Sequence, residues 1–288
     1  MTVSDEKNKT EKGVLYLVAT PIGNLSDISE RAVKVLSEVD FVAAEDTRNS
    51  GKLLSLFGVK KPMICYFEHN KAKRGEEIIR RIQGGESCAL VTDAGMPAIS
   101  DPGEDIVRLC HECGVTVRVV PGACAAVSAL AVSGLPTGKF TFEGFLPAQK
   151  NERRRELETL KAERRTMIFY EAPHKLKQTL SDMLSVLGDR KISLCRELTK
   201  INEEVVPTTL AAAVSYYETN EPRGEYVLVV GGADDEQIKS SLFFSSMTVA
   251  EHVDHYIAAG MTKSDAMKAC AKDRGVSKSE IYAQIMKK

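Results

Sequence analysis

The sequence contains no apolar run long enough to cross a bilayer, so its composition excludes a protein built from membrane-spanning helices. Its seven cysteines are an odd number and mostly lie in apolar runs, which indicates reduced core residues of a cytoplasmic protein. Cys110 and Cys113 form a CxxC pair, but the second pair that a four-ligand zinc site needs is missing, and we expect no bound metal. A net charge of −1 favours no class of partner. Residues 1–12 are polar and charge-balanced, so we expect a disordered tail rather than a signal peptide.

With 288 residues, 43% of them apolar and 27% charged, the chain has the composition of a soluble globular protein with room for two compact domains. Apolar runs alternate with helical patterns in residues 13–138, which predicts an α/β domain with a doubly wound, mostly parallel sheet. We expect a second α/β domain with a mixed sheet at 139–233, including a highly charged helix at 151–165. A polar linker at 234–247 and a small helical module at 248–288 complete the predicted organisation.

The apolar run at residues 88–91 predicts a buried strand, and the loop after it, at 93–103, is rich in glycine and proline and begins with Asp93. In open α/β sheets ligands dock where loops leave the carboxyl ends of strands, although this composition also suits an ordinary connection. Four other predicted strands end in polar or turn-forming residues, at 21–23, 45–48, 68–70 and 121–122. Because the carboxyl ends of parallel strands share one edge of a sheet, these loops converge. The sequence therefore predicts a single small-molecule cleft.

Residues 248–288 predict three short helices with a tight turn at Gly275 before the last, an arrangement similar to a helix-turn-helix module. The last two helices carry many lysines and few acids, which suits contact with a phosphate backbone. A solvated helical cap is the alternative interpretation, because basic helices are common on protein surfaces.

Nine short segments in this order resemble the tetrapyrrole methylase superfamily. The resemblance covers residues 13–232 and extends into the C-terminal helices, and within the superfamily the chain is similar to the bacterial family that methylates the 2'-hydroxyl of a cytidine in 16S rRNA. The segments are TPIGNL (20–25), AEDTR (44–48), DAGMP (93–97), SDPG (100–103), PGA (121–123), EGFLP (143–147), FYEAPH (169–174), CRELTK (195–200) and GEYVL (224–228).

The resemblance implies that S-adenosylmethionine binds between the two α/β domains of a homodimer. The family does not use the G-x-G-x-x-G fingerprint of Rossmann methyltransferases, and this chain contains none. Met96 stands where the family more often has Thr, and Cys124 stands where Ser is common. The residues implied for the cofactor are Pro21, Asp93, Ala94, Gly95, Met96, Pro97, Ile99, Gly122, Ala123, Cys124, Ala125, Phe145, Leu146, Tyr170, Glu171, Glu225, Tyr226 and Val227.

The implied reaction is S-adenosylmethionine-dependent 2'-O-methylation of a cytidine ribose in the decoding region of 16S rRNA, and the sequence does not decide between free RNA and the small ribosomal subunit as the substrate. A hydroxyl is a poor nucleophile, so a general base is expected. The candidates at predicted strand ends are Glu45, Asp46 and Glu197, and the sequence does not decide among them. Arg48 is a further catalytic candidate, because a guanidinium stabilises a developing alkoxide or holds a flanking phosphate. The residues expected to contact RNA are Arg48, Arg153, Arg154, Arg196, Lys200, Lys263 and Lys278.

Two other functions remain open at this point. One is methylation of a tetrapyrrole carbon, but a tetrapyrrole needs no basic helix at 151–165 and no basic tail. The other is a nucleic-acid-binding regulator without catalysis, and the unusual loops at five predicted strand ends favour an enzyme over it.

Overall fold

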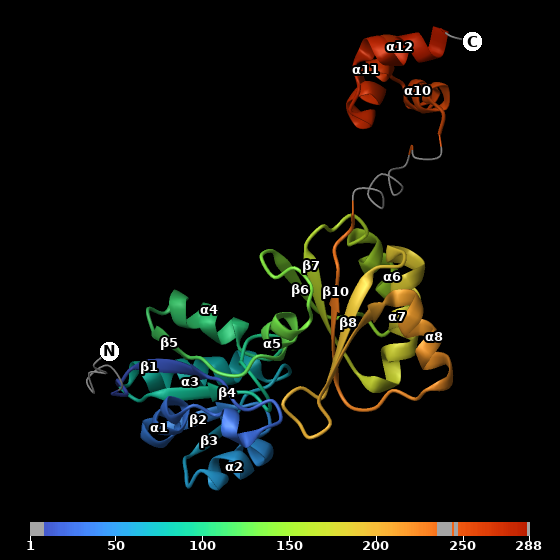
Figure 1. Ribbon diagram of the computed structural model, residues 1–288. Helices are drawn as coiled ribbons and strands as arrows, with labels where there is room; N and C mark the ends of the chain where they lie inside the picture. Colours follow the sequence, from blue (N-terminus) through green and yellow to red (C-terminus); the bar gives the residue numbers. More distant parts are fainter. Residues whose placement is uncertain (1–8, 235–243, 245–246, 287–288) are drawn as a thin grey trace, which may run out of the picture.

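The computed structural model describes residues 9–234, 244 and 247–286, and Figure 1 shows two α/β units followed by three C-terminal helices. This architecture confirms the predicted fold class. Most of the predicted tail and of the predicted linker lies outside the described residues. Within the described part of the chain, no helix combines the length and the apolar character needed to span a membrane.

The first unit contains a parallel five-stranded sheet in the order β3-β2-β4-β1-β5. Its strands are β1 (Val14–Val18), β2 (Phe41–Ala44), β3 (Met63–Cys65), β4 (Cys88–Val91) and β5 (Thr116–Val120). Strands β1 and β4 are neighbours in the sheet, and the chain leaves them in opposite directions. The connection after β1 leads to β2, on the far side of β4, and the connection after β4 leads to β5, on the far side of β1. Such a reversal opens a crevice at the carboxyl ends of the two strands, where ligands bind in doubly wound sheets.

Helices cover both faces of this sheet. Helices α1 (Glu30–Glu38) and α2 (Thr47–Leu56) pack on one face, while α3 (Lys71–Gln83) and α4 (Glu104–Glu112) pack on the other. Side chains alternate along β4, so that Val91 joins the first of these cores and Leu90 joins the second. Burial on both faces explains why the strands are continuous apolar runs in the sequence.

The second unit contains a mixed five-stranded sheet in the order β6-β7-β10-β8-β9. Its strands are β6 (Phe140–Phe145), β7 (Thr166–Glu171), β8 (Lys191–Arg196), β9 (Glu204–Thr209) and β10 (Tyr226–Val230). The pair β6 and β7 is parallel, and the other neighbours are antiparallel. The sequence patterns did not reveal β9, which contains Pro207, and proline is tolerated there because β9 is an edge strand.

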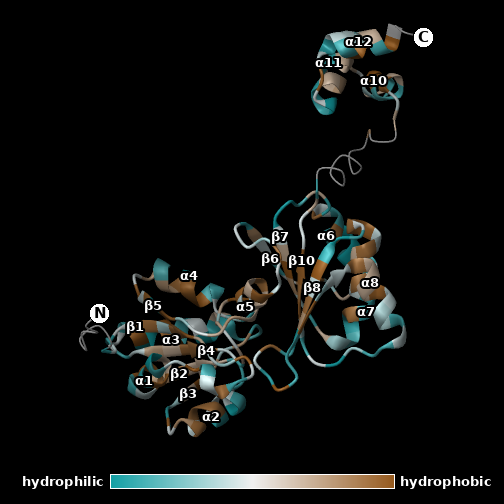
Figure 2. Ribbon diagram, viewed as in Figure 1, coloured by the Kyte–Doolittle hydropathy of each residue, from teal (hydrophilic) through white to brown (hydrophobic). Residues whose placement is uncertain are grey.

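One face of the second sheet packs against α6 (Lys150–Thr159), α7 (Pro173–Leu187) and α8 (Leu210–Thr219). The other face packs against α5 (Ala125–Val132), whose residues Ala126, Ala129 and Leu130 contact β7, β8 and β10. Helix α6 ends at Thr159, earlier than the predicted helix at 151–165. Figure 2 shows α5 almost entirely in the colour of apolar residues, lying between the two units.

Arg153, which the sequence analysis expected to contact RNA, is buried with 2% of its surface exposed. Its Nε and Nη2 donate to Oδ2 of Asp182 at 2.9 and 2.7 Å. Its Nη1 donates to the carbonyl oxygens of Pro147 and Ala148 at 3.2 and 3.0 Å. This geometry corrects the expectation, because the guanidinium joins α6 to α7 and does not face solvent.

The three C-terminal helices are α10 (Val249–Ala258), α11 (Lys263–Arg274) and α12 (Lys278–Met286). Thr248 and Thr262 cap the first two, and Gly275 ends α11 in the left-handed region at φ 64°. The helices share a small core that includes Val253, Cys270 and Ile281. The tight turn between α11 and α12 is typical of a helix-turn-helix arrangement.

We expect Arg153→Met to lower the free energy of unfolding by about 3–5 kcal/mol, because it leaves the buried Asp182 carboxylate without its main partner. Replacing both residues, as Arg153→Met with Asp182→Leu, should recover most of that loss. Urea denaturation measures both variants. Arg155→Met, which changes an exposed arginine of the same helix, should stay within about 0.5 kcal/mol of the wild type. A loss below about 1 kcal/mol for Arg153→Met would contradict the structural role of this pair.

Candidate active site

A cavity of about 360 Å³ lies between the two α/β units, within the size range of small-molecule sites. The first unit lines it with residues that follow β1 and β4 and with the start of α5. The second unit lines it with the carboxyl ends of β6, β7 and β8 and with the first residues of β10. Because β10 runs antiparallel to β7 and β8, its amino end reaches the same edge of the sheet. The cavity thus lies at the crevice that the topology of the first sheet predicts.

The loop after β4 is fastened to the loop after β1. The Thr20 amide donates to the carbonyl oxygen of Gly95 at 2.9 Å, and the Gly95 amide returns a bond to Thr20 at 3.1 Å. Gly95 has a φ of 87°, and a Cβ there would lie 3.2 Å from Cγ2 of Ile22. A side chain at this position would therefore strain the backbone and crowd the cavity wall.

The hairpin loop between β8 and β9 forms the opposite wall. Lys200 Nζ bridges the carboxylates of Glu197 and Glu225 at 2.9 and 2.8 Å. The Glu225 amide donates to Oε1 of Glu197 at 2.9 Å. This backbone bond, followed by the bond from Lys200, lowers the pKa of Glu197. Glu197 is therefore a weakened base held in an ion pair.

The same hairpin loop packs against Gly23, in the loop after β1. A Cβ at Gly23 would lie 2.9 Å from Oγ1 of Thr199 and 3.1 Å from the carbonyl oxygen of Leu198, and it would clash with Cγ of Lys200. The second unit therefore reaches across the cavity onto the first at a position that only glycine accommodates without displacement.

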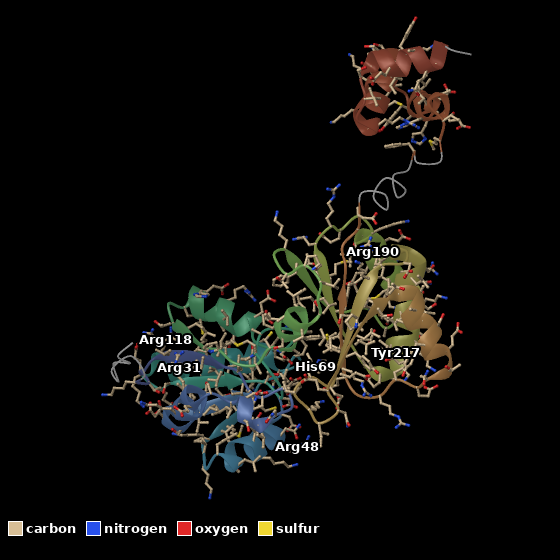
Figure 3. All side chains as sticks on the ribbon, in the orientation of Figure 1. Arg31, Arg48, His69, Arg118, Arg190 and Tyr217 are labelled. Atoms are coloured by element: carbon tan, nitrogen blue, oxygen red, sulfur yellow. The ribbon has the colours of Figure 1, made fainter. Side chains whose placement is uncertain are left out.

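Asp46 and Arg48, which follow strand β2, form hydrogen bonds and an ion pair with each other, and neither lines the cavity. Asp46 caps helix α2 by accepting a bond from the Arg48 amide at 2.8 Å, and its carboxylate pairs with the Arg48 guanidinium at 2.9 Å. The side-chain bond from Arg48 lowers the pKa of Asp46 to about 2. Figure 3 shows Arg48 and His69 on the part of the first unit that lies toward the second, with Arg31 and Arg118 on its far side.

Glu45 and Asp101 have the opposite electrostatic environment. Burial raises the pKa of Glu45, and the negative charges of Asp101, Asp93 and Asp46 raise it further. Burial also raises the pKa of Asp101, and the negative charge of Asp93 raises it further. Asp101 lines the cavity, whereas Glu45 does not. Asp93, which also lines it, accepts a bond from the Asn49 amide group at 3.0 Å.

Most residues expected to bind the cofactor meet at this cavity. Those that line it are Asp93, Ala94, Gly95, Met96, Ile99, Cys124, Ala125, Phe145, Tyr170, Glu171, Glu225, Tyr226 and Val227. Those outside its lining are Pro21, Pro97, Gly122, Ala123 and Leu146. Gly122 has a supporting role, because a Cβ there would lie 2.9 Å from Cβ of Ala19, and Leu146 belongs to the core of the second unit.

Glu197, a candidate base, and Lys200, an expected RNA contact, both line the cavity. Other lining residues were not predicted from the sequence, although all of them lie inside the segments that carry the family resemblance. The missed residues are Ile22, Ser100, Asp101, Ala172, Cys195 and Leu198.

Several cations expected to contact RNA have carboxylate or hydroxyl partners within the chain. Arg154 donates to Oγ of Ser185 at 3.0 Å, and Arg196 pairs with Glu204 at 3.0 Å. Lys263 and Lys278 are exposed on the C-terminal helices. Among the residues that the structure describes, no cluster of three or more histidine, cysteine, aspartate or glutamate side chains could hold a metal ion.

We expect Gly23→Ala to weaken binding of S-adenosylmethionine, the ligand implied by the sequence, by about tenfold or more, because the new Cβ displaces the loop that carries Lys200. Calorimetric titration measures this affinity. Gly138→Ala is the matched control, since a Cβ at Gly138 meets open space. Equal affinities of the wild type and Gly23→Ala would show that this contact does not shape the cavity.

Comparison with known proteins identifies the architecture. The family model for Tetrapyrrole (Corrin/Porphyrin) Methylases matches residues 14–214. Uroporphyrin-III-C-methyltransferase from Thermus thermophilus superposes with a TM-score of 0.53 at 20% identity, covering 80% of this chain and 97% of that one. A cobalt precorrin-4 methyltransferase superposes with a TM-score of 0.56 at 18% identity, covering 80% and 98%. These structures share the fold of the two α/β units.

Curated relatives are much more similar in sequence. Ribosomal RNA small subunit methyltransferase I from Halalkalibacterium halodurans is 48% identical over 281 residues, covering 98% of this chain and 97% of the relative. The protein of that name from Bacillus subtilis is 46% identical, covering 95% and 94%. The one from Thermotoga maritima is 47% identical over 222 residues, covering 77% of this chain but 100% of its own. From these similarities, the chain belongs to the tetrapyrrole methylase family and, within it, to the ribosomal RNA small subunit methyltransferase I family.

Proposed function

We propose that this chain is a cytoplasmic S-adenosylmethionine-dependent methyltransferase that acts on the small ribosomal subunit. It transfers a methyl group to the 2'-oxygen of a cytidine ribose in the decoding region of 16S rRNA. The observation that carries the proposal is the cavity between the two units, into which both bring residues of the family segments. The near full-length similarity to a ribosomal RNA methyltransferase supports this substrate over a tetrapyrrole.

The residues around the cavity fit S-adenosylmethionine. The Cys124 side chain does not cap α5, and the Ala126 amide in the first turn donates to the Tyr170 hydroxyl at 3.2 Å. The Ala125 amide, at the cavity, can receive a carboxylate. Asp93 and Asp101 supply negative charge for the sulfonium and ammonium groups. When bound, the cofactor supplies the electrophilic methyl group, and the chain aligns the ribose oxygen and removes its proton.

Asp101 is the carboxylate best suited to accept that proton. It lines the cavity, and burial raises its pKa, so it is a stronger base than an ordinary aspartate. Asp46 and Glu197 have lowered pKa values and are engaged by Arg48 and Lys200. Glu45 also has a raised pKa but lies outside the lining, which makes it the second candidate.

The proposed catalytic part consists of the two α/β units, and the three C-terminal helices follow it. The 222 residues of the Thermotoga maritima relative suffice for the two sheets, which run from Val14 to Val230, but not for these helices as well. Exposed Lys263 and Lys278 support a contribution of the helices to RNA binding.

We propose that two copies of the chain form a homodimer. Helix α5 is apolar except at Ser128, yet only one face packs on the second sheet, and Val127 and Val132 remain exposed. A helix that is hydrophobic all round is normally buried. Val119 on the edge strand β5 and Phe140 on the edge strand β6 are also exposed. A second copy of the chain is the partner that we propose covers this surface.

The direct test of the function is incubation of purified small subunits with labelled S-adenosylmethionine, followed by mapping of ribose-methylated positions. The proposal predicts label on one cytidine 2'-oxygen of 16S rRNA. Transfer of the label to a tetrapyrrole in a parallel reaction, and not to the subunit, would contradict it.

We expect Asp101→Asn to lower kcat about 10²- to 10⁴-fold at saturating S-adenosylmethionine, because the amide accepts no proton. In the wild type the rate should fall as the pH drops through the raised pKa of Asp101, since only the carboxylate acts as a base. This acid limb should lie above the pH expected for an ordinary aspartate and disappear in the variant. Loss of the limb in Glu45→Gln instead would move the base to Glu45.

We expect Val127→Lys combined with Val132→Lys to convert the dimer to a monomer, because two charges would be buried at the shared surface of α5. Light scattering coupled to size-exclusion chromatography measures the mass. Leu56→Lys changes an exposed leucine on α2 and should leave the dimer intact. A wild-type chain that elutes as a monomer at micromolar concentration would contradict the proposed interface.

A further inference from the structure

A second hollow lies on the surface of the second unit, between α6 and α7, which pack on the same face of the sheet (Figure 1). We call it the α6–α7 groove. Its volume is about 410 Å³, and its lining residues are Lys150, Arg153, Lys177, Gln178, Ser181 and Asp182. Among the described residues that line it, none is apolar, whereas small-molecule sites are lined mainly by apolar side chains. The groove therefore suits a charged, hydrated partner.

A buried ion pair holds the two walls of the groove together. The guanidinium of Arg153 on α6 donates to Asp182 on α7 at 2.9 and 2.7 Å. Lys150 lies one turn before Arg153, and Gln178 lies one turn before Asp182, so each shares a helix face with a member of the pair. Because Arg153 matches the charge of Asp182, the two lysines decide the sign of the charge in the groove.

Both lysines are available to an anion. Lys150 is exposed at the first residue of α6, and no side chain caps the start of that helix, so the helix dipole adds to the positive potential. Lys177 pairs with Glu221 at 2.7 Å, but the Glu221 side chain is 80% exposed. A surface ion pair of this kind is weak, and a phosphate group can take the place of Glu221. Gln178 and Ser181 add neutral hydrogen-bond donors, which also contact phosphates in nucleic-acid complexes.

The groove begins at the edge of the sheet that carries the cavity. Helix α6 follows the end of β6 at Phe145, and α7 starts directly after Ala172, and both of these residues line the cavity. Since an α-helix rises 1.5 Å per residue, Lys177 lies only about 6 Å along the axis of α7 from its first residue, Pro173. A polymer with one residue at the cavity therefore reaches the groove with its neighbouring residues.

We propose that the α6–α7 groove binds the phosphate backbone of the RNA strand next to the target cytidine. The charge of the groove is complementary to that of a phosphodiester chain, and its polar lining offers nothing to an apolar partner. Phosphate contacts fix the position of a nucleic acid without reading its sequence. The groove thus positions the substrate and takes no part in methyl transfer. This inference rests on the function proposed above.

The test is Lys150→Ala combined with Lys177→Ala in the full-length protein, with binding of small ribosomal subunits measured over a series of KCl concentrations. We expect binding at low salt to weaken by about tenfold or more, because two phosphate contacts and their released counterions are lost. The plot of log K against log[KCl] should become less steep by about 1.4–1.8. The affinity for S-adenosylhomocysteine, measured by calorimetry, should stay within about twofold.

A second variant tests the same groove in the opposite direction. Glu221→Gln removes the acidic partner of Lys177 and leaves the lysine to the RNA. We expect it to bind small subunits about two- to fivefold more tightly at low salt. A damaged fold would not produce tighter binding.

Lys60→Ala combined with Lys191→Ala is the matched control. It removes the same charge from two exposed lysines at the amino ends of β3 and β8, on the sheet edges opposite the cavity. This variant should bind small subunits with the affinity and salt dependence of the wild type.

The outcomes separate the groove from the proposed function. An unchanged salt dependence in Lys150→Ala with Lys177→Ala, or an equal change in the control, would overturn the groove while an active wild type keeps its function. A reduced salt dependence in this variant alone, from a wild type that binds subunits but methylates no ribose, would support the groove and overturn the function. A wild-type chain that binds no small subunits would overturn both.

Discussion

The pair of backbone hydrogen bonds between Thr20 and Gly95 is the constraint on which the site depends. It joins the loops that leave β1 and β4, the two strands at which the direction of the connections reverses. Reversal of the connections leaves a crevice at the carboxyl ends of these two strands. The pair of hydrogen bonds holds the two loops that border this crevice together. The second unit then closes it, because its β8–β9 hairpin loop packs against Gly23 in the loop that carries Thr20. One cavity with walls from both units is the consequence.

Charge is distributed unequally over these walls. On the second unit, Lys200 neutralises Glu197 and Glu225 in a compact ion-pair group. On the first unit, the carboxylates of Asp93 and Asp101 line the cavity, with Glu45 near enough for their charges to raise its pKa. This side of the cavity favours a positively charged ligand, and S-adenosylmethionine carries its reactive methyl group on a sulfonium. Burial there raises the pKa of Asp101, which agrees with its proposed role as the general base.

The sequence pattern predicted the fold class and a cleft at the strand ends, because parallel strands bring their carboxyl ends to one edge whatever their order along the chain. Most of the individual lining residues were expected from the family resemblance. It did not predict β9, since a short edge strand with Pro207 carries little periodicity. The role of Arg153 depends on which side of α6 faces α7, and helical spacing among many arginines does not reveal that. Asp101 was missed because a Ser-Asp-Pro-Gly segment is typical of a turn, and only the folded loop shows its carboxylate at the cavity.

The central claim is that residues from both units bind one S-adenosyl ligand in this cavity. A crystal structure of the chain with S-adenosylhomocysteine tests it most directly. The account predicts ligand density in contact with the 93–101 loop on one side and with residues 225–227 on the other. Density that contacts only one unit, or that lies outside this cavity, would contradict it.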